Sequence, residues 1–94
     1  MTALKSNKRL ALGRLIITRG IFEYVPEGDF WDAVTRHTNG DWGEVCDSDW
    51  ELNDAALTNN ARVLSIYTAD NGVRFWIITE WDRSSTTVLL PLEY

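Results

Sequence analysis

The chain is poor in the residues that most often build reactive or metal-binding sites, since its 94 residues include one cysteine and one histidine. A lone Cys46 excludes an intrachain disulfide and a cysteine-rich zinc site, and a lone histidine excludes a pair of His ligands. Glu44 and Asp47 lie close to Cys46, and their negative charge disfavours the thiolate that a nucleophilic cysteine needs. We therefore predict no metal and no cofactor, and the unpaired thiol suits a reducing, cytoplasmic setting.

Long apolar runs and positive charge are also scarce. The apolar stretch from Leu10 to Ile17 is interrupted by Gly13 and Arg14, so nothing in the sequence predicts a membrane span or a signal peptide. The net charge of −5 and the pI near 4.6 oppose binding to phosphate backbones and anionic membranes. The middle of the chain concentrates acidic residues and predicts an acidic face: Asp41, Glu44, Asp47, Asp49, Glu51 and Asp54.

What the chain does have is aromatic residues, with five tryptophans in a length that normally forms one domain. A core of this size has difficulty covering five indole rings together with three Tyr and three Phe. We predict a flexible tail at residues 1–9, a single domain at residues 10–94, and at least one tryptophan exposed at the surface.

Short-range signals place two helices ahead of a group of strands. Asp29 is a suitable N-cap for a helix over residues 30–38 that Asn39 and Gly40 end. Asp47 or Ser48 caps a second helix over residues 49–57, which Asn59 and Asn60 end. The apolar positions of this helix, spaced by multiples near 3.6, are Trp50, Leu52, Ala56 and Leu57. Residues 19–24 read as a short helix, whereas residues 10–18 fit either a strand or a helical turn.

Residues 62–93 contain three apolar stretches separated by two polar turns, the pattern of an antiparallel β-meander. If Asn71 and Gly72 form a two-residue type I′ turn, Ile66 lies opposite Ile77. That register predicts one core face: Leu64, Ile66, Phe75, Ile77, Val88 and Leu90. It predicts an opposite face with Ser65, Tyr67, Trp76, Ile78, Glu80, Thr87 and Leu89. The predicted fold is α+β, with two short helices packed on one face of a three- to four-stranded antiparallel meander in the C-terminal part of the chain.

Few residues offer catalytic chemistry, because no phosphate loop, dinucleotide motif or nucleophile elbow occurs. His37 as general acid, Glu80 as base and either Arg74 or Arg83 as anion stabiliser would be a minimal set for cleaving RNA by attack of its own 2′-hydroxyl. A histidine near a helix C-terminus is also explained by the helix dipole alone. The polar turn after residue 79 can bind a ligand or can simply satisfy its own amides.

Exposed aromatic and acidic residues are the alternative source of function, because aromatic anchors dominate association energies. The residues that we assign to a protein-binding surface are Asp41, Trp42, Asp49, Tyr67, Trp76, Asp82 and Arg83.

Three segments carry a resemblance to a known group of proteins. Gly40-Asp41-Trp42-Gly43, Asn53-Asp54-Ala55-Ala56-Leu57 and the closing ITEWDRSSTTVLLPLEY resemble motifs of short bacterial proteins labelled "plasmid-related", over roughly residues 10–94. Further matching positions include Arg36 and His37. The resemblance implies a setting on plasmids, phages or integrated elements, and it transfers no activity.

Three functions remain open from the sequence. The first is a cytoplasmic protein-binding module of a mobile element, for example an inhibitor of a host defence complex. The second is a small ribonuclease-like enzyme that uses His37 and Glu80. The third is a structural or regulatory homodimer joined through the free face of the sheet.

Overall fold

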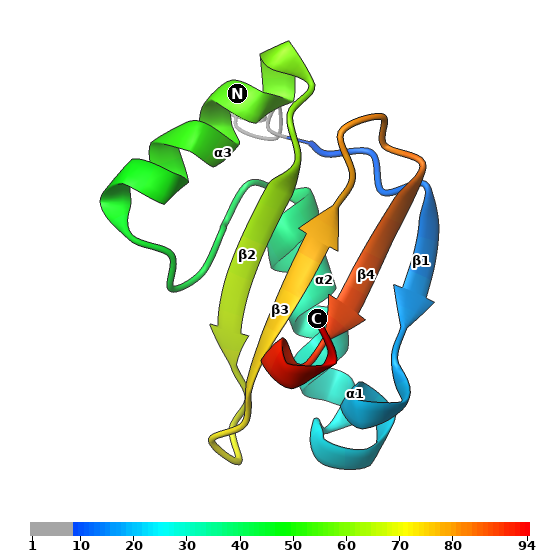
Figure 1. Ribbon diagram of the computed structural model, residues 1–94. Helices are drawn as coiled ribbons and strands as arrows, with labels where there is room; N and C mark the ends of the chain where they lie inside the picture. The colour runs from blue at the N-terminus through cyan, green and yellow to red at the C-terminus, as the bar shows by residue number, and fades with distance from the viewer. Residues whose placement is uncertain (1–8) are drawn as a thin grey trace, which may run out of the picture.

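The chain folds as an α+β domain that consists of α-helices and one four-stranded sheet (Figure 1). The computed structural model describes residues 9–94, so the predicted tail, apart from Arg9, lies outside the described residues. The α+β class is confirmed, as is the position of three strands after the helices. Between residues 9 and 94, none of the helices has the length and apolar character needed to cross a bilayer.

The sheet has the strand order β1, β4, β3, β2 and is mixed. The predicted meander consists of β2 (Val63–Thr68), β3 (Arg74–Thr79) and β4 (Ser85–Leu89). β1 (Arg14–Ile17) lies parallel to β4 at one edge, with Arg14 beside Ser85. A parallel neighbour needs a long crossover connection, and the helices and the other two strands lie within it. The segment that fitted both strand and helix is therefore a strand over its second half.

The helices form where the capping residues and the periodicity predict them, but the two longer helices begin two or three residues earlier than predicted. Their bounds are Arg19–Tyr24 for α1, Glu27–Thr38 for α2 and Asp47–Asn59 for α3. Asp29, the predicted N-cap of α2, lies inside its first turn and accepts a hydrogen bond from the backbone N–H of Asp70 at 2.9 Å. Asp41 N–H bonds the carbonyl of Arg36, and Gly40 N–H bonds that of His37, which ends α2 in a Schellman motif.

The predicted register of the first hairpin is wrong by one residue. Ala69 N–H donates to the carbonyl of Val73, so the loop holds three residues and Ser65, rather than Ile66, lies opposite Ile77. Asn71 does not take the positive φ of a type I′ turn; its side-chain amide donates to the carbonyl of Tyr24 instead. A one-residue shift moves every side chain of a strand to the other face. Leu64 and Ile66 therefore leave the core face, and Ser65 and Tyr67 enter it.

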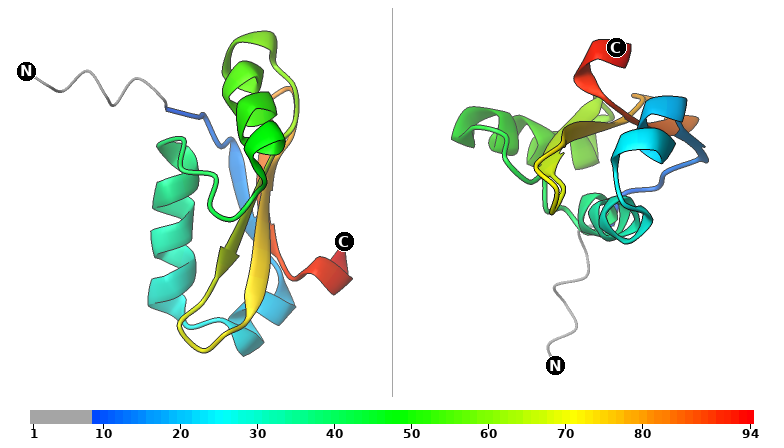
Figure 2. Two further views of the ribbon diagram at one scale, coloured as in Figure 1. Left: turned by 90° about the vertical axis from the view of Figure 1, so that its left-hand side faces the viewer. Right: turned by 90° about the horizontal axis from the view of Figure 1, so that it is seen from below.

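The core lies between α2 and one face of the sheet. Figure 2 shows α2 on this side and the short 3₁₀ helix η2 (Pro91–Glu93) on the other. The largest buried apolar cluster includes Ile21, Phe30, Tyr67, Phe75, Ile77 and Val88. A second cluster beneath α3 holds Leu10, Trp42, Ala56 and Val63. We call the face of the sheet opposite α2 the open face; its side chains are Leu64, Ile66, Trp76, Ile78, Thr87 and Leu89.

The backbone of the edge strand β2 is covered by two separate contacts. The side-chain amide of Asn53, on α3, donates to the carbonyl of Leu64 at 2.9 Å and accepts from its N–H at 3.4 Å. Two residues along, Ile66 N–H bonds the carbonyl of Trp42, and Glu44 N–H bonds the carbonyl of Ile66. An uncovered strand edge invites pairing with another chain, and both contacts prevent that at β2.

Gly43 lies at the centre of the second contact. Its φ is +76°, and a Cβ there would overlap the carbonyl oxygen of Ile66 and the ring of Tyr67. We expect Gly43→Ala to lower the free energy of unfolding by more than about 2 kcal/mol, because left-handed strain and the backbone clash act together. Urea unfolding followed by circular dichroism measures this loss.

Gly28→Ala is the matched control. Gly28 lies in the first turn of α2, and a Cβ there would meet no atom within 4 Å. We expect that variant to be as stable as the wild type or more stable by up to about 1 kcal/mol. Equal losses in the two variants would refute the role assigned to Gly43.

Candidate functional site

His37 is fully buried and belongs to a chain of hydrogen bonds that crosses the core. Its Nδ1 lies 2.6 Å from the hydroxyl of Ser65, and its Nε2 lies 2.8 Å from the hydroxyl of Thr79. Thr79 lies 2.7 Å from the hydroxyl of Thr86, which donates to the carbonyl of Leu12 at 2.8 Å. The chain therefore links α2, β2, β3 and β4 to the segment before β1.

The hydrogen bond from Thr86 to Leu12 determines which group donates and which accepts in each of the other bonds. Because Thr86 donates its only hydroxyl proton to Leu12, it must accept from Thr79, and Thr79 must then accept from His37. His37 consequently carries its proton on Nε2 and accepts from Ser65 at Nδ1. The neutral imidazole satisfies every partner, whereas a second proton on Nδ1 would require the Ser65 hydroxyl to turn and accept instead of donating.

Burial, together with a smaller effect of the nearby charge of Arg83, lowers the pKa of His37 from about 6.5 to about 3. A histidine that remains neutral and unexposed can neither reach a substrate nor exchange a proton with one. The imidazole and hydroxyl groups of these hydrogen bonds therefore stabilise the fold.

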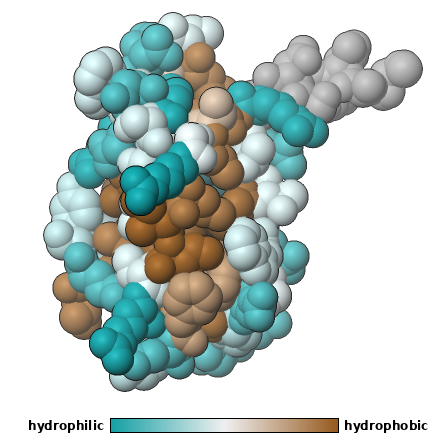
Figure 3. Space-filling model, turned by 90° about the vertical axis from the view of Figure 1, so that its right-hand side faces the viewer, coloured by the Kyte–Doolittle hydropathy of each residue, from teal (hydrophilic) through white to brown (hydrophobic). Residues whose placement is uncertain are grey.

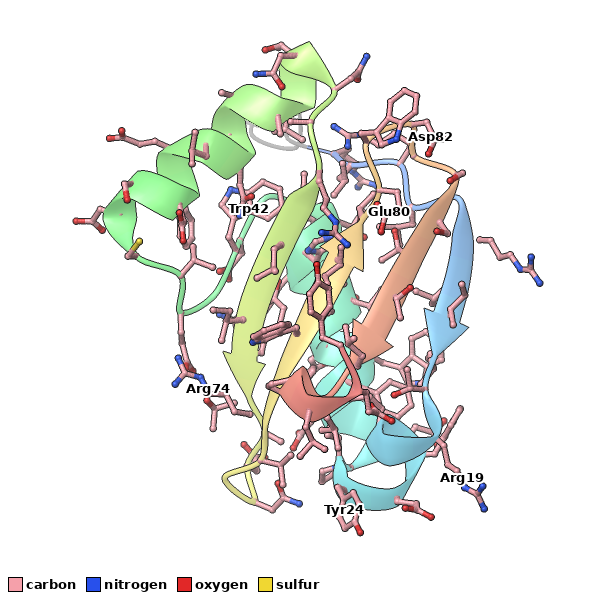
Figure 4. All side chains as sticks on the ribbon, viewed as in Figure 1. Arg19, Tyr24, Trp42, Arg74, Glu80 and Asp82 are labelled. Carbon is pink, nitrogen blue, oxygen red and sulfur yellow. The ribbon has the colours of Figure 1, made fainter. Side chains whose placement is uncertain are left out.

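The structure does not bring the predicted catalytic residues together. Glu80 accepts a hydrogen bond from Arg62, which also donates to the hydroxyl of Tyr94, and the Tyr94 ring packs edge-on against Trp76 of the open face. Glu80 therefore belongs to the opposite side of the sheet from His37. Figure 4 shows Glu80 beyond the end of β3, near Asp82 of the β3–β4 turn.

Arg83 is engaged in holding the fold rather than free to stabilise an anion. Its guanidinium donates to the carbonyls of Ala56 and Ala61, both at 2.7 Å, and to that of Glu80 at 3.1 Å. The first of these carbonyls belongs to the last turn of α3, where a cation is favourable. Arg83 thus ties the end of α3 to the β3–β4 turn, and its backbone has a left-handed φ of +61°.

Two residues assigned to a binding surface, Trp42 and Tyr67, are buried in the interior, so those assignments are corrected, whereas the side chain of Asp41 is 46% exposed. Trp42 is 0% exposed, packs edge-on against His37 and donates from Nε1 to Asp54 at 3.0 Å. Tyr67 is buried and donates its hydroxyl proton to the carbonyl of Asp41. The carboxylate of Asp41 accepts from Arg36 and from the N–H of Gly43, and the Arg36 hydrogen bond contributes most to lowering the Asp41 pKa. Figure 4 shows Trp42 between α3 and β2.

Asp49 and Trp76 lie on the surface where the structure does form a concave site. A groove of about 220 Å³ runs between α3 and the edge of the open face, and we call it the α3 groove. Its lining residues are Asp49, Leu52, Asn53, Arg62 and Leu64. Ile66 and Trp76 continue the same face beyond Leu64, because Ile66 is two residues along β2 and Trp76 is its partner on β3. Both are partly exposed.

Leu52 is the residue of the α3 groove that the sequence interpretation missed. The periodicity of residues 49–57 assigns it to the apolar stripe of the helix, but its side chain is 66% exposed. The signal was present in the spacing, since Asn53 and Ala56 face the sheet and Leu52 lies about 100° away from Asn53 around the helix.

The β3–β4 turn carries the most exposed tryptophan of the chain. Trp81 is 64% exposed, which confirms that the core cannot cover every indole ring. Asp82 accepts from the backbone N–H of Ser84 at 3.0 Å, the local turn contact that its residue type favours. The polar turn therefore satisfies its own amides.

A second, polar cavity of about 120 Å³ lies between α2 and the β2–β3 hairpin, and Asp29, Asp32, Arg36 and Asp70 contribute to its lining. Two of its charged groups already have partners, because Asp29 bonds Asp70 N–H and Arg36 pairs with Asp41. No cluster of three or more His, Cys, Asp or Glu side chains able to hold a metal ion occurs within residues 9–94.

Comparison with known proteins adds no assignment, because no family model, curated protein or solved structure matches this chain.

The buried state of His37 predicts how stability changes with pH. The unfolded chain binds a proton at His37 below about pH 6.5, whereas the folded chain binds it only near pH 3, so the unfolded state holds more protons between these values. We expect the free energy of unfolding to fall on acidification through this window, by up to about 1.4 kcal/mol per pH unit from this group. Urea unfolding at pH 7, 5.5 and 4 measures the slope.

His37→Gln separates this contribution from that of the carboxylates. The glutamine does not titrate, so we expect a smaller loss of stability between pH 6.5 and pH 4 than in the wild type, whatever the stability of the variant at pH 7. Identical slopes in the two proteins would show that His37 does not stay neutral in the fold.

Proposed function

We propose that this chain is a small acidic protein-binding module whose partner docks in the α3 groove and on the adjoining open face. The partner is an element with an apolar strip flanked by basic residues. In the setting that the resemblance implies, the partner belongs to the host of a plasmid or phage, for example a defence complex, and binding takes place in the cytoplasm.

The observation that carries this proposal is an exposed apolar residue beside a partly exposed apolar floor. Leu52 is 66% exposed on the wall of the groove, and Leu64, Ile66 and Trp76 are only half buried. Ordinary surface leucines occur singly, whereas this one adjoins a concave apolar strip. A partner that covers the strip removes all four side chains from water and gains the favourable free energy of their burial.

The acidic side chains around the α3 groove favour a basic partner. Asp49 lines the groove, and Asp47, Asp49 and Glu51 lie exposed on α3. In contrast, the basic residue at the groove, Arg62, is already bonded to Glu80 and Tyr94. Complementary charge speeds encounter and selects among partners, so the rim of this groove favours a basic one.

A ribonuclease-like role has no supporting geometry in the described residues. His37 is enclosed by the core, Glu80 lies across the sheet from it, and Arg83 is bonded to three carbonyls. The binding role rests on different residues and does not depend on these.

Retention of a host protein by immobilised wild-type and variant chains tests the proposal. Leu52→Lys places a second positive charge in the groove and removes the exposed apolar anchor. We expect it to weaken retention at physiological salt at least about tenfold, while circular dichroism shows an unchanged fold.

Trp31→Lys is the matched control, because Trp31 is also a large exposed side chain, 44% exposed, but lies on α2 on the other side of the sheet. It should retain the same protein as the wild type does. If the wild type retains nothing, or if both variants lose the protein equally, the α3 groove is not the binding site.

A further inference from the structure

The two edges of the sheet differ in whether other residues cover their backbone groups. The β2 edge is covered by Asn53 and by residues 42–44, whereas within residues 9–94 no strand or loop pairs with the outer edge of β1. Arg14 N–H bonds the carbonyl of Ser84, and Thr18 N–H bonds that of Val88, so the even-numbered residues of this segment turn their backbone groups toward β4. Leu15 and Ile17 therefore turn theirs outward, away from the sheet.

Apolar side chains surround this outer edge. Figure 3 looks onto it and shows a broad hydrophobic area over β1 and α1. Ile16 and Phe22 are 40% and 66% exposed, and Leu15 and Ile17 are only partly buried. A contiguous apolar patch at an unpaired strand edge is the combination that natural proteins avoid unless another chain covers it.

Charge around the edge is complementary to a second copy of the same chain. Arg14, at the start of β1, has no ionic or hydrogen-bonding partner for its side chain within residues 9–94. Glu93, near the other end, accepts from the hydroxyl of Thr18 at 2.6 Å and from the N–H groups of Gly20 and Leu90. All three donors are neutral, so among the described residues no cation pairs with this carboxylate.

We propose that two copies of this chain pair antiparallel through β1, about a two-fold axis at Ile16. In this register Leu15 lies opposite Ile17 of the second copy, and the outward N–H and C=O groups of these residues form the hydrogen-bonded pairs. Ile16 meets Ile16 of the second copy on the open face. The two four-stranded sheets then form one continuous eight-stranded sheet.

The same register accounts for the charges. Arg14 lies opposite Thr18 of the second copy, on the same face, and Thr18 holds the carboxylate of Glu93. The dimer therefore brings each unpaired guanidinium to the Glu93 carboxylate of the other copy, twice by symmetry. The contact is at the opposite edge of the sheet from the α3 groove, so it is independent of the proposed binding function and leaves that groove open.

Sedimentation equilibrium of the full chain over a range of concentrations tests the pairing. We expect the wild type to reach twice its 10.8 kDa mass as concentration rises. Ile16→Lys puts two like charges against each other at the axis, and Arg14→Glu puts a carboxylate beside Glu93. We expect each change to weaken dimerisation at least about tenfold.

Two matched controls carry the same changes away from the edge. Leu52→Lys introduces the same charge at an exposed apolar site on α3, and Arg9→Glu reverses an exposed charge outside β1. Both should dimerise as the wild type does. Hydrogen exchange gives a second measurement, because the amides of Leu15 and Ile17 should be protected in the wild type and exchange rapidly in Ile16→Lys.

A wild type that remains at 10.8 kDa up to about 1 mM, where the association free energy is only about −4 kcal/mol, overturns the proposal. So does a dimer that forms without protection of Leu15 and Ile17, since it must use another surface. Equal weakening by Leu52→Lys and Ile16→Lys would likewise place the contact elsewhere.

Discussion

The buried chain of hydrogen bonds from Ser65 to Leu12 is the constraint on which the rest of the structure depends. Each link joins a different element, and His37 supplies both a donor and an acceptor at its centre. A buried polar group without a partner costs more free energy than its hydrogen bond contributes. A shift of β2 by one residue would turn Ser65 outward and leave Nδ1 of the imidazole without a partner. The polar chain therefore selects one register, which apolar packing alone would leave less strictly defined.

Local sequence signals predicted the elements, and distant contacts decided the details that they did not predict. The two longer helices and the three strands of the meander follow from capping residues, periodicity and turn residues. The register of the first hairpin does not, because Asn-Gly suits both a two- and a three-residue loop. What distinguishes them is the bond from Asn71 to Tyr24, which lies 47 positions away. β2 is apolar at Leu64 and Ile66 as well as at Val63, so its own alternation does not indicate which side faces the core. Local signals also do not predict that β1 pairs in parallel with β4.

The candidate site was harder to predict because the same chemistry serves structure and function. The imidazole of His37, the guanidinium of Arg83 and the indole of Trp42 were singled out for what they could do to a substrate or a partner. In the fold they bond two hydroxyls, three carbonyls and one carboxylate of the protein itself. The Gly-Asp-Trp-Gly segment is likewise explained by its docking on β2. Leu52 is the reverse case, since its type and spacing suggested core packing and it lies at the surface.

The pairing of β1 with β4 also bears on the order in which the molecule assembles. β2, β3 and β4 join through short turns, whereas the bond from Thr86 to Leu12 links residues 74 positions apart. Closing so long a loop costs entropy that only a preformed docking surface can offset. We therefore expect the meander and α2 to form before β1 adds to them. By the same reasoning, β1 is the strand that detaches first when the native state opens locally, while the three-stranded remainder keeps its core.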